Sequence, residues 1–294
     1  MPLSPKLTGR DAAARRPYLP AINLIMDATI VIPVFNQLHY TRQCLESLNA
    51  AGCPDAMIVV VNNASTDGTT EFLATRPALR VITNAENRAC AAAWNQGFQA
   101  STTGWILFLN NDVVTPRGWL ENLVAFAEES GADLASPALG EGELDYDLAD
   151  YARDFMAEMR AVWRRSIDGG VCFLVHRRVF ASIGEFDENF RHGGNEDVDF
   201  FWRARNAGFK LVTTGSSYLH HFGNVTQRAL AQEHGSTRAE TVGYFRTKWK
   251  IGWWQRRWSR WQRKLTEAWQ AGSERRRHGH TLREWRAGGK IFYR

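Results

Sequence analysis

The stretch WILFLNND, residues 105–112, is an apolar run that ends abruptly in three small polar residues. Such a run is typical of a buried strand, because consecutive apolar side chains need cover on both faces of a sheet. The strand would deliver the carboxylate of Asp112 to its C-terminal end, the edge at which open α/β sheets bind ligands. We therefore expect the other elements to build a pocket around Asp112.

Strands and helices alternate along the chain on both sides of this stretch. The expected strands lie at 28–34, 56–61, 80–82, 105–109, 133–136 and 171–176. The expected helices lie at 40–50, 69–73, 89–100, 115–129, 145–165, 177–183 and 197–207. Alternation at this interval indicates right-handed βαβ crossovers, and therefore a mainly parallel sheet with helices on both faces.

The composition is that of an ordinary globular protein. The 294 residues are 44% hydrophobic, enough for one large α/β core with an appendage or for two modest domains. The four cysteines lack CxxC or metal-ligand spacing, which favours a reducing compartment over a disulfide framework. No apolar run reaches the roughly 18–20 residues that span a bilayer, and no cleavage site follows the early arginines. We therefore expect a cytoplasmic protein.

Five motifs follow one another in a fixed order. They are VIPVFN (31–36), VNNASTDGT (61–69), NRACAAAWNQG (87–97), LNNDVV (109–114), and GEFDENF with NEDVDFFWRARNAG (184–208). Together they resemble the inverting family 2 glycosyltransferases with a GT-A fold, over about residues 28–223. The resemblance implies a Rossmann-like α/β fold and the transfer of a sugar from a nucleoside diphosphate to a hydroxyl group. On this basis the chain divides into an N-terminal extension (1–27), a GT-A catalytic domain (28–235) and a C-terminal amphipathic helical region (236–294).

The resemblance implies that the turns after the first two strands bind the nucleoside, with Pro33 and Phe35 as walls and Asn62 against the base. The family usually has aspartate where Asn62 stands. Because an amide both donates and accepts hydrogen bonds, uracil and thymine remain compatible, and we expect a UDP-sugar or dTDP-sugar donor. The residues expected to contact the nucleotide sugar are Pro33, Phe35, Asn62, Asn87, Arg88, Asn110, Asn111 and Gly170.

Two of these residues, Arg88 and Asn62, also have simple structural alternatives. Asn87 and Arg88 precede an expected helix, where backbone amides and a cation favour phosphate or ribose oxygens, but Arg88 fits a solvated surface position almost as well. The polar cluster that begins at Asn62 also has the composition of a turn. Gly170 would let a sugar approach the backbone closely, because glycine has no side chain.

A divalent cation, Mg²⁺ or Mn²⁺, is the standard partner of a departing diphosphate. Similar enzymes place Asp-x-Asp where this chain has Asn110-Asn111-Asp112, so one carboxylate is left and we assign Asp112 to the metal. Asn110 is expected to contact ribose or metal-bound water. Similar enzymes also supply a histidine about two dozen residues after the catalytic base, which favours His221 as the second ligand and leaves His220 as the alternative.

The catalytic base is expected at the start of the helix at 197–207. By resemblance Asp197 removes the proton of the acceptor hydroxyl, with Glu196 as the runner-up or as an orienting group. Asp199 is expected to pair with Arg203 four residues later. The alternative reading is that acids at a helix start serve the helix dipole, which explains one of them more readily than three.

The C-terminal region is rich in tryptophan and basic residues. From Arg246 to Arg294 fifteen lysines and arginines face three acids, so this segment carries +12 and the first 245 residues carry −7 of the net charge of +5. A stripe at helical spacing is formed by Trp254, Trp258, Trp261, Leu265 and Trp269. We expect one amphipathic helix in an anionic membrane interface, on the inner face of the cell membrane and near a lipid-linked glycan acceptor.

Other partners for the stripe are the catalytic domain itself or a second subunit, which would make a homo-oligomer. The acidic body argues against a nucleic-acid partner. Two other functions compete with transfer to a glycan in polysaccharide or lipopolysaccharide synthesis. A non-catalytic glycan-binding or partner-binding relative is suggested because Asn62 and Asn110 replace two usual acids. A nucleotidyltransferase is disfavoured, since no glycine-rich basic loop follows the first strand.

Overall fold

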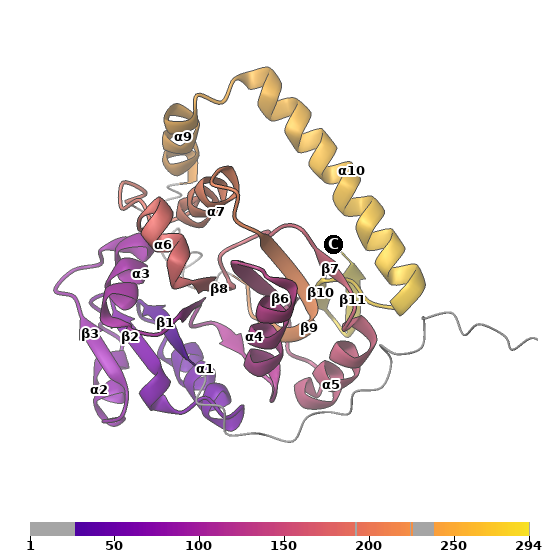
Figure 1. Cartoon of the computed structure of the whole chain (residues 1–294). Coiled ribbons are helices and arrows are strands. Elements are labelled where there is room, and N and C mark those ends of the chain that lie inside the picture. Colours follow the sequence, from indigo (N-terminus) through magenta and orange to yellow (C-terminus); the bar gives the residue numbers. More distant parts are fainter. Residues whose placement is uncertain (1–26, 192, 224, 226–237, 294) are drawn as a thin grey trace, which may run out of the picture.

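A computed structural model describes residues 27–191, 193–223, 225 and 238–293. The expected N-terminal extension, 1–27, lies outside these residues apart from Asp27. The described chain forms a curled central sheet with helices on both faces (Figure 1), which confirms the expected fold class.

The strands of the described residues are β1 (Ala28–Val34), β2 (Ile58–Asn62), β3 (Arg80–Thr83), β4 (Trp105–Leu109), β5 (Val113–Val114), β6 (Leu134–Gly142), β7 (Trp163–Arg164), β8 (Cys172–His176), β9 (Leu211–His221), β10 (Arg283–Ala287) and β11 (Lys290–Tyr293). The α-helices are α1 (Leu38–Ala50), α2 (Thr69–Ala74), α3 (Ala89–Ala100), α4 (Trp119–Ser130), α5 (Leu148–Met159), α6 (Arg177–Ile183), α7 (Glu196–Asn206), α9 (Arg238–Trp249) and α10 (Trp253–His278).

The main path of the sheet has the order β11-β10-β6-β8-β4-β1-β2-β3. The four strands β3, β2, β1 and β4 run parallel, as their alternation with helices predicts. Beyond β4 the sheet is mixed, because β8 runs antiparallel to both β4 and β6. β4 therefore lies in the middle of the sheet, and its C-terminal end points to the edge where the site is expected.

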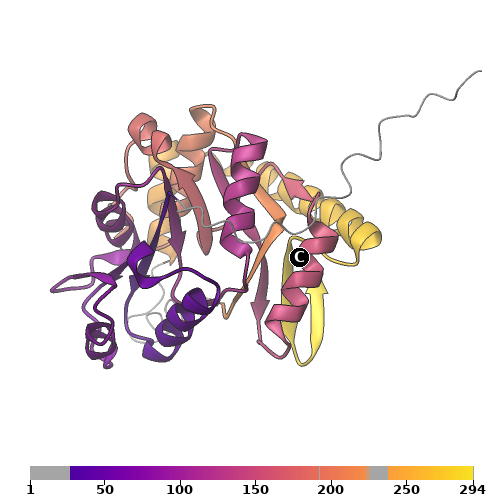
Figure 2. The ribbon, with the colours of Figure 1, turned by 60° about the horizontal axis from the view of Figure 1, so that its bottom comes forward.

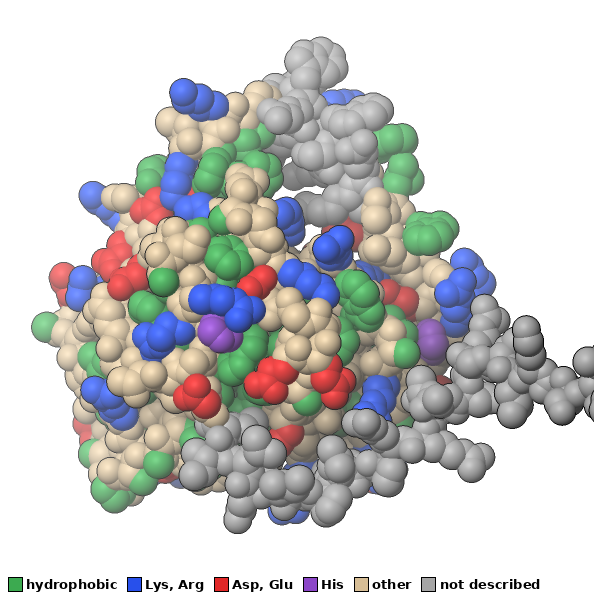
Figure 3. All heavy atoms as spheres, viewed as in Figure 1, with side chains coloured by type: hydrophobic (Ala, Val, Ile, Leu, Met, Phe, Trp, Pro, Cys, Tyr) green, Lys and Arg blue, Asp and Glu red, His purple; other side chains and the backbone are tan. Residues whose placement is uncertain are grey.

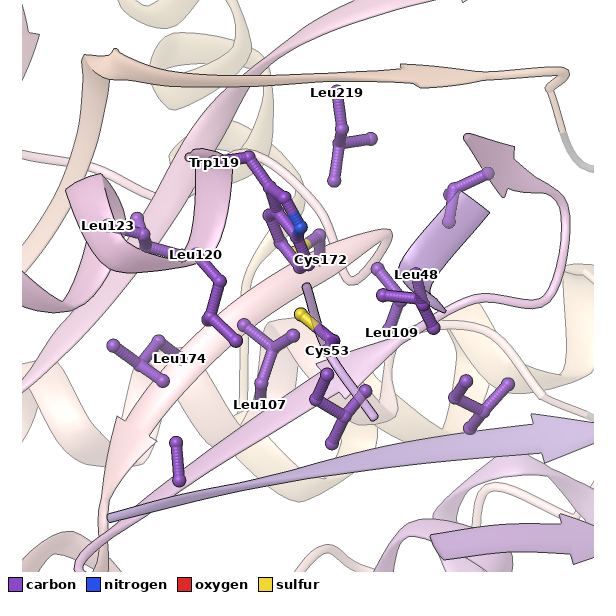
Figure 4. Close-up of a cluster of buried hydrophobic side chains, with 14 of the residues drawn as sticks. Leu48, Cys53, Leu107, Leu109, Trp119, Leu120, Leu123, Cys172, Leu174 and Leu219 are labelled. Atoms are coloured by element: carbon purple, nitrogen blue, oxygen red, sulfur yellow. The ribbon is translucent and has the colours of Figure 1, made fainter. Parts of the chain in front are cut away.

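The two faces of β4 enter different hydrophobic layers. Leu107 and Leu109 pack with α1 and α4, where Trp119 is fully buried (Figure 4). Ile106 and Phe108 pack on the opposite face with α3, α6 and α7. Alternation of side chains along a strand sends neighbouring residues to opposite faces, so an unbroken apolar run is what a doubly covered strand requires.

Two helices differ from their expected bounds by more than two residues. α4 begins at Trp119 rather than at residue 115, because Gly118 has a left-handed φ of +78° that a right-handed helix does not contain. α5 ends at Met159, and the chain then forms the short strand β7 instead of continuing as a helix to residue 165.

The C-terminal region holds two helices followed by a hairpin. α9 and α10 are separated by residues 250–252, and β10 and β11 then join the sheet through parallel pairing of β10 with β6. Figure 2 shows this hairpin at the sheet edge beside α5. The sequence did not predict these two strands, because their charged residues are typical of a solvent-exposed segment. No helix in the described part of the chain is long and apolar enough to cross a membrane.

Candidate active site

Adjacent strands bring three ionisable side chains together near the end of β4. Asp112 lies between β4 and β5, and antiparallel pairing of β5 with β9 sets Val113 opposite His221. Parallel pairing of β6 with β9 sets Glu141 beside the same histidine. His221 Nε2 is 3.3 Å from Asp112 Oδ1, and His221 Nδ1 is 3.3 Å from Glu141 Oε1.

This cluster is buried, and its charges stabilise one another. Burial alone would lower the pKa of His221, but hydrogen bonds to Asp112 and Glu141 raise it to about 9. Burial raises the pKa of Asp112, yet the hydrogen bond and charge of His221 and the amide of Val225 hold it below its usual value. For Glu141, hydrogen bonds from His221 and Arg283 outweigh burial and lower the pKa to about 2.

The tandem histidines point in opposite directions, as neighbours on a strand must. His220 lies with its Nδ1 3.0 Å from the hydroxyl of Tyr146 and its Nε2 3.2 Å from the carbonyl oxygen of Gly142. Burial is the largest cause that lowers the pKa of His220, to about 4. The residue beside Asp112 is therefore His221 rather than His220.

The donor set suits a hard divalent cation. The carboxylate of Asp112 is the kind of oxygen ligand that Mg²⁺ and Mn²⁺ prefer, in nucleotide sites together with substrate phosphates, whereas the imidazole nitrogen of His221 is a softer ligand that fits Mn²⁺ better than Mg²⁺. The carboxylate of Glu141 lies beside the other ring nitrogen of His221, and a metal-binding histidine usually has such a hydrogen-bond partner. Within the described residues no group of three or more His, Cys, Asp or Glu could hold a metal by itself. Phosphates and water would have to complete the shell.

A second carboxylate pair opens α7. The helix begins at Glu196, after Asn195 adopts a left-handed φ of +73°. Burial and the charge of Asp197 raise the pKa of Glu196 to about 8, and no described residue offers a hydrogen bond to its Oε2 atom. Burial also raises the pKa of the Asp197 carboxyl, whose Oδ1 accepts a hydrogen bond of 2.8 Å from the amide of Val198.

Gly170 lies directly against this aspartate. A Cβ atom added at Gly170 would be 2.8 Å from Asp197 Oδ2 and 2.9 Å from its Cβ, closer than real contacts allow. The next residue, Val171, accepts a hydrogen bond of 2.9 Å from the amide of Asn110. The acidic start of α7 and the end of β4 therefore meet at the loop that carries Gly170.

The expected pair on α7 is confirmed. Arg203 Nε donates to Asp199 Oδ2 over 2.9 Å. The other oxygen of Asp199 receives hydrogen bonds from Trp249 Nε1 (2.8 Å) and Lys248 Nζ (2.7 Å). α9 is thus attached to the helix that carries Asp197, a contact between distant parts of the chain that sequence reasoning missed.

Two of the expected nucleotide contacts have their amides engaged inside the protein. Asn62 is fully buried, donating to the hydroxyl of Thr70 over 2.9 Å and accepting from the amide of Ser65 over 3.0 Å. Asn111 is buried and donates to Thr41 Oγ1 over 2.9 Å. Both side chains fix loops at the edge of the sheet.

The remaining expected contacts lie at the surface of that edge. Pro33 lies near the end of β1 and Phe35 directly follows it; both are half-buried, as is Asn110 after the neighbouring parallel strand β4. Asn87 Oδ1 accepts a hydrogen bond of 3.0 Å from the amide of Ala89. Arg88 Nη2 lies 3.6 Å from a carboxylate oxygen of Glu188, and both of these side chains are 46% exposed.

The sequence profile described as glycosyl transferase family 2 matches residues 29–184, just over half of the chain. The pre-mycofactocin glycosyltransferase of Mycobacterium tuberculosis is 29% identical over 212 residues, covering 68% of this chain and 44% of the relative. The succinoglycan biosynthesis protein ExoO of Rhizobium meliloti is 26% identical over 234 residues, covering 73% of this chain and 66% of that protein. The chain thus spans less than half the length of the first of these relatives.

A solved structure shares the architecture. The crystal structure of GalNAc-T7 with UDP, GalNAc and Mn²⁺ superposes with a TM-score of 0.53 at 16% identity, over 66% of this chain and 43% of the other. Identity this low bears on the fold alone, and the fold is that of the GT-A glycosyltransferases. Together with the matching profile over residues 29–184, this fold places the chain in glycosyl transferase family 2.

Proposed function

We propose that this protein transfers a sugar from a UDP-sugar or dTDP-sugar to a hydroxyl group of a glycan, with inversion at the anomeric carbon, in polysaccharide or lipopolysaccharide synthesis. The observation that carries the proposal is the meeting of two acidic groups at the end of β4: Asp112 with His221 on one side, and Asp197 against Gly170 on the other. Membership of family 2 and the succinoglycan relative support the reaction class.

Asp112 and His221 would hold the divalent cation, Mg²⁺ or Mn²⁺. When bound, such a cation neutralises the negative charge of a departing diphosphate. GalNAc-T7, which shares the fold, was crystallised with UDP and Mn²⁺. Pro33, Phe35 and Asn110 would line the nucleoside, and Asn87 and Arg88 would reach its phosphates. Asn62 and Asn111 would act by holding the loops in shape.

Asp197 would act as the general base. Its Oδ1 accepts a hydrogen bond from the amide of Val198, its Oδ2 faces Gly170, and this carboxylate would take the proton of the acceptor hydroxyl. A base on the side of the sugar opposite the leaving group directs attack to that face, and this gives inversion. The raised pKa of Asp197 improves proton transfer, because a base is most effective when its pKa lies near the working pH.

We propose that α10 lies on an anionic membrane surface near a lipid-linked acceptor, on the cytoplasmic side. Trp261, Leu265 and Trp269 recur every four residues and are 55%, 51% and 71% exposed. Hydrophobic side chains protrude along α10 in Figure 3. The side chains of Trp254 and Trp258 lie outside those that the structure describes. A second subunit is the alternative partner of this stripe.

Binding and transfer measurements test the function. UDP-sugars and dTDP-sugars are titrated with Mn²⁺ into the wild type, Asp112→Ala and Asp197→Asn. We expect Asp112→Ala to abolish metal-dependent nucleotide binding, and Asp197→Asn to keep binding but lose transfer. Wild-type protein that binds no nucleotide would favour a non-catalytic relative instead. Binding retained by Asp112→Ala would move the metal to other residues.

A further inference from the structure

The C-terminal hairpin places an arginine next to the cluster that surrounds His221. β10 pairs in parallel with β6, and Trp285 of β10 lies opposite Glu141. Arg283, two residues earlier on the same face of β10, reaches Glu141 diagonally. β5, β9, β6 and β10 are successive neighbours, so one side chain from each strand, or from beside it, forms a continuous row.

The members of the row are joined by hydrogen bonds. Arg283 Nε donates to Glu141 Oε2 over 2.6 Å, and Arg283 Nη2 donates to Oε1 over 3.1 Å. The same Oε1 atom lies 3.3 Å from His221 Nδ1, and His221 Nε2 lies 3.3 Å from Asp112 Oδ1. Glu141 is only 4% exposed. Its orientation is therefore set by the two-pronged pair with Arg283 rather than by water.

The hairpin is held in place by contacts outside this row. On the opposite face of β10, the fully buried Glu284 accepts hydrogen bonds from the hydroxyl of Tyr151 (2.5 Å) and from His280 Nδ1 (3.1 Å). Glu274 of α10 forms a buried two-pronged pair with Arg164, both contacts at 2.7 Å. The backbone of β10 therefore has anchors that do not depend on Arg283.

We propose that Arg283 is a positioning residue for the metal site, acting through Glu141 to fix the ring of His221; this rests on the proposed assignment of Asp112 and His221 to the cation. A histidine ligand depends on the partner of its other ring nitrogen, which fixes the direction in which the ligating nitrogen points. Arg283 holds that partner. Without the arginine fork, the Glu141 carboxylate is free to rotate, and the imidazole of His221 loses its fixed direction toward Asp112.

Binding of Mn²⁺ alone to the full chain, followed by the electron paramagnetic resonance signal of free Mn²⁺, tests the proposal without an activity assay. Arg283→Gln should weaken Mn²⁺ binding about tenfold, at the low end of the range for partners of histidine ligands. Glu284→Gln is the matched control, because it disturbs the anchoring of the same strand from its other face. This control should bind Mn²⁺ within twofold of the wild type, a margin of roughly 0.4 kcal/mol.

The outcomes separate this inference from the proposed metal site. A wild type that binds no Mn²⁺, or an Asp112→Ala variant that binds it normally, overturns the metal assignment itself. If Asp112→Ala abolishes binding while Arg283→Gln retains wild-type affinity, only the role of Arg283 is refuted. Equal losses in Arg283→Gln and Glu284→Gln would assign the effect to docking of the hairpin, and would refute the role of Arg283 as well.

Thermal melting in the absence of metal identifies a variant that fails to fold. In that case Arg283→Lys replaces Arg283→Gln, because lysine keeps the charge but cannot form the two-pronged pair. We expect this variant to weaken Mn²⁺ binding about threefold. Affinity unchanged by the lysine variant would count against the proposal.

Discussion

Gly170→Ala should slow sugar transfer while leaving nucleotide binding intact. The new methyl group would lie 2.8 Å from Asp197 Oδ2, 2.9 Å from its Cβ and 3.1 Å from its Cγ. To restore ordinary van der Waals contact, the carboxylate has to move by roughly half an ångström. A displacement of about 1 Å costs on the order of a hundredfold in rate, so we expect kcat to fall about 10- to 100-fold, or about 1.4–2.7 kcal/mol of barrier.

Gly169→Ala is the matched control, because a Cβ atom at Gly169 meets nothing within 4 Å. Release of nucleoside diphosphate from the donor sugar gives kcat for both variants, and calorimetry gives the affinity for the nucleotide. We expect Gly169→Ala to behave as the wild type in both assays. The reasoning is wrong if Gly170→Ala and Gly169→Ala have the same kcat, or if the loss in Gly170→Ala lies in nucleotide affinity.

Three further predictions follow from burial and charge. Folding raises the pKa of Glu196 from 4.5 to about 8, so its ionisation lowers the stability of the folded protein as the pH increases through that window. Glu196→Gln should therefore raise Tm at pH 8 but not at pH 4. Equal effects of the substitution on Tm at both pH values would contradict this. Leu265→Ser with Trp269→Ser should reduce co-sedimentation with anionic vesicles and leave Tm unchanged, whereas undiminished binding would exclude α10 as the membrane surface. Glu274→Ala leaves Arg164 buried without its partner and should destabilise the protein by about 3–5 kcal/mol in urea unfolding; a loss below about 1 kcal/mol would indicate that water reaches the pair.

The fold could be predicted from the sequence because its main signals are local. The unbroken apolar run before Asp112 predicted a strand covered on both faces, and β4 enters both hydrophobic layers. Turn and helix signals gave the order of the main elements up to α7, but the two-residue strands β5 and β7 and the long strand β9 were not predicted. The start of α4 and the end of α5 were not predicted, because Gly118 has a left-handed φ and the chain leaves the helix after Met159.

The candidate site was predictable only in part. Asp112 stands out because it ends an apolar strand, and the structure sets His221 beside it. Glu141 and Arg283 carry no local signal, since each is one charged residue on a strand, and their contact depends on pairing between segments 142 residues apart. For Asn62 the residue type was misleading. An asparagine fits recognition of a base, but in the structure its side-chain amide makes hydrogen bonds to the segment that follows β2.

The row from Asp112 to Arg283 also has a consequence for how the protein matures during synthesis. Translation delivers the chain from its N-terminus, so β1 to β4 and their helices can assemble while later segments are still in the ribosome. His221 follows Glu141 by 80 residues, and Arg283 follows Glu141 by 142 residues. A nascent chain therefore carries β1 to β4 long before it carries a completed row, and on the proposed assignment of Asp112 and His221 to the cation, full Mn²⁺ affinity should appear as a late step, after β10 has emerged.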